Sequence, residues 1–177
     1  VICSLMTDRK PLPGKLAFSR DLFVLLFLLR GMPFVDLAFL RRCDLQGNVI
    51  TYHRRKTSRK LTVVVGKEAM EIIQKYMYAI PDSPYLFPII QNPGKDEYGQ
   101  YARMLRLQNY RLTQVANILG IRDRLSTYTA RHTWATTALR QNYNSSLICD
   151  AMGHSSVKVT ETYFQPYRDD EVNRMNS

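Results

Sequence analysis

Cysteine is scarce in this chain, and its three cysteines, Cys3, Cys43 and Cys149, are scattered without a Cys-x-x-Cys pair. An odd and dispersed set argues against a disulfide framework and against a structural zinc site, because both need closely paired cysteines. The same scarcity favours a protein of the reducing cytosol.

Long hydrophobic runs are also lacking. The one extended run reaches from Leu22 to Leu29 and lies between Asp21 and Arg30. It is far shorter than the roughly 20 apolar residues that a membrane-spanning helix needs, and no small-residue cleavage site follows it. We therefore interpret this run as a buried helix and not as a membrane span or a signal peptide.

Acidic residues are outnumbered, with 15 Asp and Glu against 25 Lys and Arg, which gives a net charge of +10. This balance favours a polyanionic partner, although many ordinary domains are basic. The 177 residues, 45% of them hydrophobic, are enough for one globular domain with a hydrophobic core. Because the chain begins with Val1 and not with methionine, we expect it to be a fragment of a longer protein.

The pattern of apolar residues predicts a mainly α fold with a small antiparallel β-sheet, an α+β class. Proline and glycine make residues 1–16 a turn-rich linker, and Ser19 or Asp21 is expected to cap a helix that ends at Leu29. Two β-branched strands, 49–52 and 61–65, are expected to pair as a hairpin. The other predicted helices cover 34–41, 67–78, 98–119 (one long helix or a helix pair), 128–141, 145–152 and a short stretch from Ser155 or Ser156 to Gln165.

Three residues in the last third of the chain point to phosphodiester chemistry: Arg131, then His154 after Gly153, then Tyr163 nine residues later. A tyrosine phenol, with an ordinary pKa of about 10, becomes a useful nucleophile when positive donors already hold the phosphodiester that it attacks. Arginine grips two phosphate oxygens at once, and histidine offers a donor or a base near neutral pH. The alternatives are a surface arginine, a helix-terminal histidine and a half-buried packing tyrosine.

Two segments carry a family resemblance. Ala-Arg-His-Thr-Trp-Ala-Thr at 130–136 and Met-Gly-His-Ser-Ser-Val-Lys-Val-Thr-Glu-Thr-Tyr at 152–163 are similar to the two best signatures of the tyrosine recombinases, the phage-integrase family. The resemblance extends from about Phe18 onward. It implies a catalytic domain at 17–165, followed by a C-terminal tail at 166–177.

The resemblance also implies roles. Tyr163 is expected to attack a DNA phosphodiester and form a 3′-phosphotyrosyl link, while Arg131 and His154 hold the phosphate; neither a cofactor nor a metal is needed. His132 follows Arg131 directly, so it points to a different face of the helix and is expected to support the site without catalysing.

A lysine on the hairpin protonates the leaving 5′-oxygen in this family, because an alkoxide leaves poorly without a general acid. Lys56, in Arg54-Arg55-Lys56-Thr57, matches that position. We expect Arg54, Arg55 and Lys60 beside it to contact DNA, although a solvated basic turn accounts for these residues equally well. Arg103 and Arg106, three apart on one helix face, form either further phosphate contacts or an ordinary solvated face.

The sequence departs from the family at two positions. Tyr128 replaces the histidine of the His-x-x-Arg box, and its phenol can still donate a hydrogen bond to a phosphate oxygen. The stretch from Arg30 to Asp36 aligns with the Thr-Gly-x-Arg-x-x-Glu box, with Pro33 in the place of the first catalytic arginine. Its Arg-Gly-Met pattern resembles integrases of conjugative transposons and related elements from Bacteroides-type bacteria.

Proline cannot donate a hydrogen bond, so another arginine is needed at the phosphate. We expect Arg30 to reach back across the Gly31 bend, with Asp36 orienting its side chain. The other candidates are Arg42, Arg54 and Arg55.

These features together predict the catalytic domain of a site-specific DNA recombinase, an integrase of a mobile element that acts on double-stranded DNA at the nucleoid in the bacterial cytoplasm. The acidic tail resembles the segment that family members pack onto a neighbouring protomer, so a homotetramer on DNA is expected. Two alternatives stay open. One is a type IB topoisomerase, which shares the chemistry, and the other is a DNA-binding domain that has lost activity through Pro33 and Tyr128.

Overall fold

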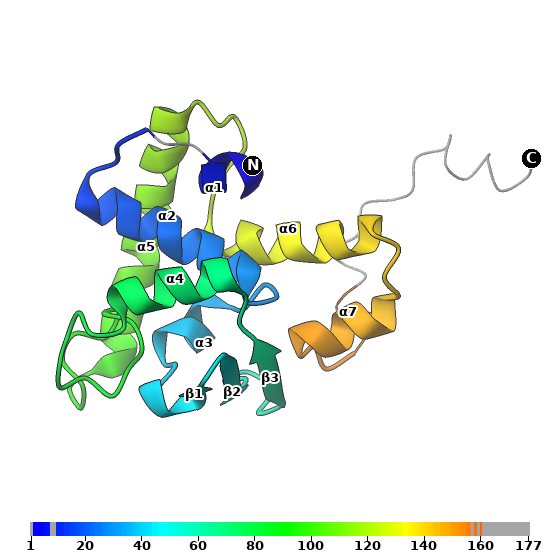
Figure 1. Ribbon diagram of the computed structural model, residues 1–177, viewed down its shortest axis with the longest axis horizontal. Helices are drawn as coiled ribbons and strands as arrows, with labels where there is room; N and C mark the ends of the chain where they lie inside the picture. Colours follow the sequence, from blue (N-terminus) through cyan, green and yellow to red (C-terminus); the bar gives the residue numbers. More distant parts are fainter. Residues whose placement is uncertain (1, 8–9, 157, 159, 161–177) are drawn as a thin grey trace, which may run out of the picture.

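A computed structural model describes residues 2–7, 10–156, 158 and 160 of the chain. The elements run in the order α1 (Ile2–Thr7), α2 (Gly14–Leu28), α3 (Phe34–Ala38), η1 (Arg42–Asp44), β1 (Leu45–Gln46), β2 (Val49–His53), β3 (Lys60–Val64), α4 (Lys67–Tyr76), α5 (Glu97–Leu119), α6 (Thr127–Arg140) and α7 (Ser145–Met152). The prediction of a mainly helical fold with a small antiparallel sheet is confirmed (Figure 1).

Helix α2 lies at the centre of the domain, where it contacts α1, α4, α5 and α6 (Figure 1). Leu22, Leu25 and Leu26 are completely buried, and their neighbours Phe23 and Val24 are nearly so. A helix that is apolar on all sides has to be covered on all sides, and these partners provide that cover. The hydrophobic run is therefore a core helix, as its length predicts, and no helix in the described part of the chain has both the length and the hydrophobicity that crossing a bilayer requires.

The predicted start of this helix was wrong. Helix α2 begins at Gly14, with Pro13 as its N-cap, and Ser19 and Asp21 are buried inside it. Proline at a helix start loses no hydrogen bond, because the first N–H groups of a helix have no partner within it. Asp21 accepts a hydrogen bond from Lys75 Nζ at 2.7 Å and so links α2 to α4. Residues 1–16, predicted as a turn-rich linker, also contain α1.

The sheet has three antiparallel strands in the order β1-β2-β3 and lies at one end of the helical layer (Figure 1). Strands β2 and β3 are the predicted hairpin, with Ile50 opposite Val63 and Tyr52 opposite Leu61. Ile50 and Tyr52 are both buried, as expected for alternate residues on the core-facing side of a strand. This alternation continues beyond the strand, so Arg54 in the turn is buried as well.

The remaining helices follow the predicted pattern, with small differences in their bounds. Helix α5 is one continuous helix, which ends at Gly120 in a left-handed conformation (φ 68°). Helix α3 ends at Ala38 and not at Arg41, because the chain there turns to pair with the loop before α5: Leu86 N donates to Leu40 O and Arg42 N donates to Pro84 O. The short helix predicted up to Gln165 lies mostly outside the described residues.

Helices α6 and α7 pack on each other through a small separate cluster of Ala135, Ala138, Ile148 and Met152. Helix α7 then ends at Gly153, whose φ of 63° belongs to the left-handed region that glycine tolerates best. This ending brings the loop at residues 153–154 beside the turn between β2 and β3 (Figure 1).

Candidate active site

Arg131 joins three segments that are distant in the sequence. It lies on α6 with only 5% of its surface exposed. Its Nη1 donates to the carbonyl oxygen of Gly31, and its Nη2 donates to Met152 O at 2.9 Å and lies 2.6 Å from Nε2 of His154. The predicted pair Arg131 and His154 is therefore in direct contact, inside the protein.

Gly31 is the residue against which the backbone of α6 packs. Its φ is 66°, and a Cβ atom added there would lie 3.1 Å from Cα of Arg131. A larger residue would strain the backbone and push α6 away, and the hydrogen bond from Arg131 to Gly31 O would lengthen. Glycine is needed here for close approach as well as for its conformation.

Arg54 lies in the same cluster. It is buried, so it does not belong to a solvated basic turn, and its contact with DNA stays a prediction. Its exposure is only 6%. The alternation of β2 explains why: Ile50, Tyr52 and Arg54 are two residues apart and face the core together. Its Nη1 donates to Met152 O, the same carbonyl oxygen that accepts from Arg131.

Asp36, on α3, is the acidic partner of this cluster and is 3% exposed. Its Oδ2 lies 2.7 Å from Nε of Arg54, in an ion pair that lacks the alignment of a hydrogen bond, and its Oδ1 accepts from the backbone N–H of Arg55 at 2.9 Å. Burial raises the pKa of the Asp36 carboxyl, while the Arg55 N–H and the charges of Arg54 and Arg131 act in the opposite direction. The buried guanidinium groups of Arg54 and Arg131 therefore both lie near the carboxyl of Asp36.

His154 is neutral in this environment. Burial lowers its pKa to about 4, and the charges of Arg131, Arg54 and Lys56 add to that effect. Its Nδ1 lies 2.7 Å from Oγ1 of Thr160. Its backbone is also fixed, because its N–H donates to Cys149 O at 3.0 Å.

The turn between β2 and β3 is attached to the end of α7 by several contacts. Arg59 donates to His154 O at 3.3 Å and forms an ion pair with Asp150 at 2.9 Å. Thr57 Oγ1 donates to Gly153 O at 3.4 Å. The last carbonyl groups of a helix carry partial negative charge, so the C-terminus of α7 is a natural partner for these cationic side chains.

The other predicted catalytic residues lie outside the buried cluster or outside the described residues. Lys56 is exposed in the turn, near enough for its charge to lower the pKa of His154. Tyr128 is 58% exposed in the first turn of α6, three residues before Arg131, and His132 is half-buried on the same helix. Arg30 has a left-handed backbone (φ 59°), and its Nη1 donates to Thr62 O of β3 at 3.3 Å. Tyr163 lies outside the described residues.

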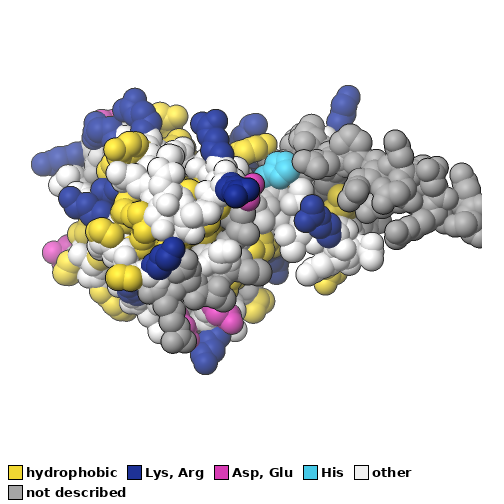
Figure 2. Space-filling model, turned by 90° about the horizontal axis from the view of Figure 1, so that it is seen from above, with side chains coloured by type: hydrophobic (Ala, Val, Ile, Leu, Met, Phe, Trp, Pro, Cys, Tyr) yellow, Lys and Arg dark blue, Asp and Glu magenta, His cyan; other side chains and the backbone are white. Residues whose placement is uncertain are grey.

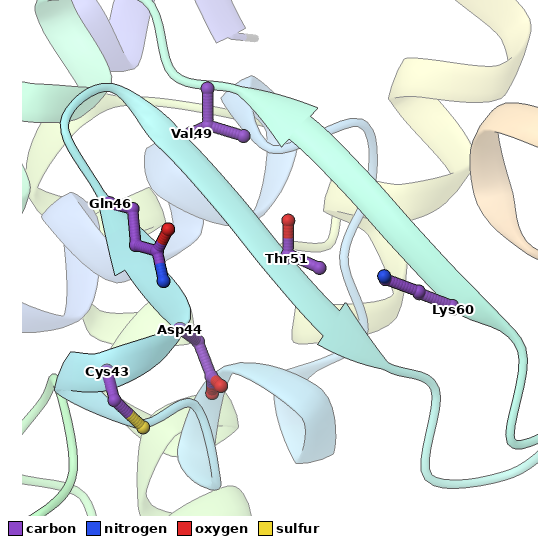
Figure 3. A pocket seen from close by; sticks show the side chains of 6 residues that line it. All are labelled: Cys43, Asp44, Gln46, Val49, Thr51 and Lys60. Carbon is purple, nitrogen blue, oxygen red and sulfur yellow. The ribbon is translucent and has the colours of Figure 1, made fainter.

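The predicted DNA-contacting residues are exposed apart from Arg54. The Arg55 guanidinium stacks on the ring of Phe39 at 3.8 Å, and Arg103 lies 3.8 Å from Asp96 in an exposed pair. Arg106 is exposed on α5. Lys60 lies beside Thr51 at a hollow of about 530 Å³ on the sheet (Figure 3). Basic side chains outnumber acidic ones on the face drawn in Figure 2.

Among the described residues, no group of three His, Cys, Asp or Glu side chains is arranged to hold a metal ion. The polar groups of the cluster are instead two guanidinium groups, the carboxyl of Asp36, one neutral imidazole and backbone carbonyl oxygens. Guanidinium groups offer hydrogen-bond donors and positive charge together, which suits them to bind anions.

The model of the phage integrase family matches residues 4–169. The chain belongs to the phage integrase family. It is 26% identical, over 86% of its length, to a tyrosine recombinase XerC from Thermodesulfovibrio yellowstonii, and the match covers 52% of that protein. The chain thus spans about half the length of this curated relative.

Solved structures of recombinases have the same fold. The crystal structure of XerA recombinase superposes with a TM-score of 0.66 at 20% identity, covering 98% of this chain and 59% of that one. The Tn1549 transposon integrase in complex with circular intermediate DNA gives 0.66 at 18% identity, covering 96% and 66%. XerH bound to its difH substrate gives 0.63 at 17% identity, covering 99% and 50%. The predicted tyrosine-recombinase resemblance is confirmed.

The buried ion pair between Asp36 and Arg54 is expected to stabilise the fold. Replacing Asp36 by Asn leaves the Arg54 charge buried without its carboxylate, which we expect to lower the free energy of unfolding by about 3–5 kcal/mol. The matched control is Asp150→Asn, which removes the exposed partner of Arg59 and is expected to cost less than about 1 kcal/mol. Urea denaturation followed by circular dichroism measures both. Equal losses for the two variants would contradict the proposed dependence of the cluster on Asp36.

Proposed function

We propose that this chain is the catalytic domain of a site-specific tyrosine recombinase, which cleaves and rejoins double-stranded DNA through a 3′-phosphotyrosyl intermediate. The observation that supports it most strongly is the cluster of two buried guanidinium groups, from Arg54 and Arg131, beside the neutral imidazole of His154. Guanidinium groups offer several donors together with positive charge, and a DNA phosphate supplies a single negative charge with two non-bridging oxygens. Structures of proteins with this fold have been solved in complex with their DNA substrates.

The proposed reaction balances with residues of this chain. As the Oη of Tyr163 bonds to phosphorus, the hydroxyl gives up its proton. Nε2 of His154 accepts this proton once the bound phosphate has drawn Arg131 away and has offset the positive charges that lower the pKa of the ring. The bond from phosphorus to the 5′-oxygen breaks, and Lys56 protonates that oxygen. Arg131 and Arg54 stabilise the charge on the non-bridging oxygens in the transition state. A 5′-hydroxyl from the partner strand reverses these steps, so no cofactor is consumed.

Before DNA binds, backbone carbonyl oxygens accept the hydrogen bonds of the two arginines. Gly31 O and Met152 O accept from Arg131, and Met152 O also accepts from Arg54. A charged phosphate oxygen is a stronger acceptor than a carbonyl oxygen, so it can replace these contacts without moving the helices that hold the arginines. The donors are thereby oriented before the substrate arrives, which limits the reorganisation that catalysis requires.

Arg54 is a better substitute for the arginine missing at Pro33 than Arg30, although both remain proposals. Arg54 shares an acceptor with Arg131 and is held by Asp36, the acidic residue of the same sequence box. The side chain of Arg30 instead donates to Thr62 O of the sheet. It also borders a groove of about 580 Å³ between α2, α6 and α7.

That groove is our candidate for assembly into a homotetramer on DNA. It is lined by apolar groups that include Phe27, Trp134 and Leu147, with Arg30 at its border. The C-terminal tail, 166–177, contains Asp169, Asp170 and Glu171 together with apolar residues, so it matches the groove in charge and character. We propose that the tail of one protomer binds the groove of its neighbour, and that the assembly acts on DNA in the bacterial cytoplasm.

Removing the nucleophile tests the proposal directly. Tyr163→Phe should abolish covalent attachment to a nicked suicide substrate, while DNA affinity stays within about threefold, because phosphate contacts dominate binding. Denaturing gel electrophoresis of the adduct and a filter-binding titration give the two values. An adduct formed by the Phe variant would reject Tyr163, and a wild-type protein that binds DNA without any adduct would identify a non-catalytic domain. Relaxation of supercoils without recombinant products would indicate a type IB topoisomerase.

The two candidate arginines can be separated by matched variants. Arg54→Lys keeps a positive charge beside Asp36 but loses the planar fork, so we expect adduct formation to slow by at least about tenfold. Arg30→Ala removes an exposed contact and should leave the rate within about threefold of wild type. Circular dichroism checks that both proteins fold. A large loss for Arg30→Ala with near-normal cleavage by Arg54→Lys would return the role to Arg30.

The general-acid role of Lys56 predicts a dependence on the leaving group. Lys56→Ala should slow cleavage of normal DNA by about 10²-fold or more but have little effect on DNA with a 5′-bridging phosphorothiolate, because a thiolate leaves without protonation. Lys60→Ala, which removes a charge on the sheet surface, serves as the control and should affect both substrates alike. Equal slowing of both substrates by Lys56→Ala would reduce its role to DNA binding.

A further inference from the structure

Thr160 is a buried polar residue to which the mechanism above assigns no role. Its side chain is completely buried, and its Oγ1 lies 2.7 Å from Nδ1 of His154. In the sequence it precedes Tyr163 by three residues. It therefore connects the imidazole of the cluster with the segment that carries the proposed nucleophile.

The hydrogen bonds around His154 can run in one direction only. The guanidinium of Arg131 has donors and no acceptor, so the Nε2 atom 2.6 Å from it has to accept. A neutral imidazole carries one proton, which is then on Nδ1 and is donated to Oγ1 of Thr160. The opposite tautomer would direct an N–H at a guanidinium and leave Nδ1 facing the hydroxyl as an acceptor.

We propose that Thr160 is a positioning residue, which accepts from Nδ1–H of His154 and so holds the ring in the orientation that turns the unprotonated Nε2 towards Arg131. The consequence for catalysis rests on the proposed recombinase function, but the tautomer does not. This orientation leaves Nε2 free of a proton and ready to accept one in the cleavage step.

The charges around the ring act in the same direction. Arg131 from α6, and Arg54, Lys56 and Arg59 from the β2–β3 turn, are all cationic, whereas Asp36 pairs with Arg54 and Asp150 pairs with Arg59. Burial and these charges disfavour the imidazolium, with the pKa of His154 lowered to about 4. The neutral ring is therefore kept at neutral pH, and it would be lost only as the pH falls towards that value.

The tautomer can be measured on DNA-free protein by ¹⁵N NMR of the histidine rings. The chain has three histidines, so the double variant His53→Gln, His132→Gln leaves only the signals of His154. We expect a proton on Nδ1, a bare Nε2, and no titration between about pH 5.5 and 8. A proton on Nε2, or a ring that titrates in this interval, would overturn the proposal.

Two substitutions then test Thr160 itself. Thr160→Val keeps the shape but removes the acceptor of the Nδ1–H group, so we expect shifted or broadened ring signals and adduct formation at least about tenfold slower, with DNA affinity within about threefold. Thr160→Ser retains the hydroxyl and should restore both the ring signals and the rate. A Val variant with the wild-type ring signals and rate, or a Ser variant as slow as Val, would overturn the proposal. If the wild-type protein forms no adduct, the recombinase function fails, and the NMR result alone decides the role of Thr160.

Discussion

Two buried guanidinium groups meet at the carbonyl oxygen of Met152, and the elements around the site are arranged to satisfy them. A guanidinium cannot lose its charge inside a protein, so each of its donors needs an acceptor and its charge needs an anion. Asp36 supplies the charge for Arg54, while Gly31 O and Met152 O accept from Arg131. These contacts bring together the turn after α2, helix α3, the β2–β3 hairpin and the end of α7.

The backbone acceptors help to stabilise these two guanidinium groups. Carbonyl oxygens at the C-terminus of α7 carry part of the helix dipole, so they are favourable partners for nearby positive charges. A dipole contributes only a fraction of a charge, and Nε of Arg54 pairs with Asp36 without an aligned hydrogen bond. The arginines are therefore held by weak or imperfectly aligned acceptors, whereas a charged oxygen is a stronger one.

Much of the fold was predictable from the sequence because periodicity and turn residues are local signals. The hairpin, helix α5 and the burial of residues 22–26 all follow from spacing along the chain. The motif residues Arg131 and His154 were also predicted, and they are in contact. The limits of prediction are visible at Ser19, which was assigned to a helix start on its residue type alone and is buried within α2.

The partners within the site were less accessible to sequence reasoning. Arg54 was expected either to contact DNA or to lie on a solvated basic turn, whereas extending the alternation of Ile50 and Tyr52 by two residues indicates a buried side chain. Arg30 was chosen to replace the arginine missing at Pro33 because it is close in sequence. Proximity in sequence does not determine the direction of a side chain after a left-handed bend. The contact between His154 and Thr160 has no local signature, because a threonine in a helix is common.

The chemistry of the cluster depends on contacts between distant parts of the chain. Arg131 reaches a carbonyl 100 residues away, and Arg54 reaches one 98 residues away. Such contacts can form only after most of the chain has collapsed. Closing a long loop costs conformational entropy, and this cost comes before the contacts that offset it. Among the described residues, Ile148 and Met152 of α7 pack in the small cluster with α6, and both arginines donate to the carbonyl oxygen of Met152. If α7 detached for a moment, the central helices would remain in place but the two arginines would lose this shared acceptor, so the proposed site is lost more easily than the fold.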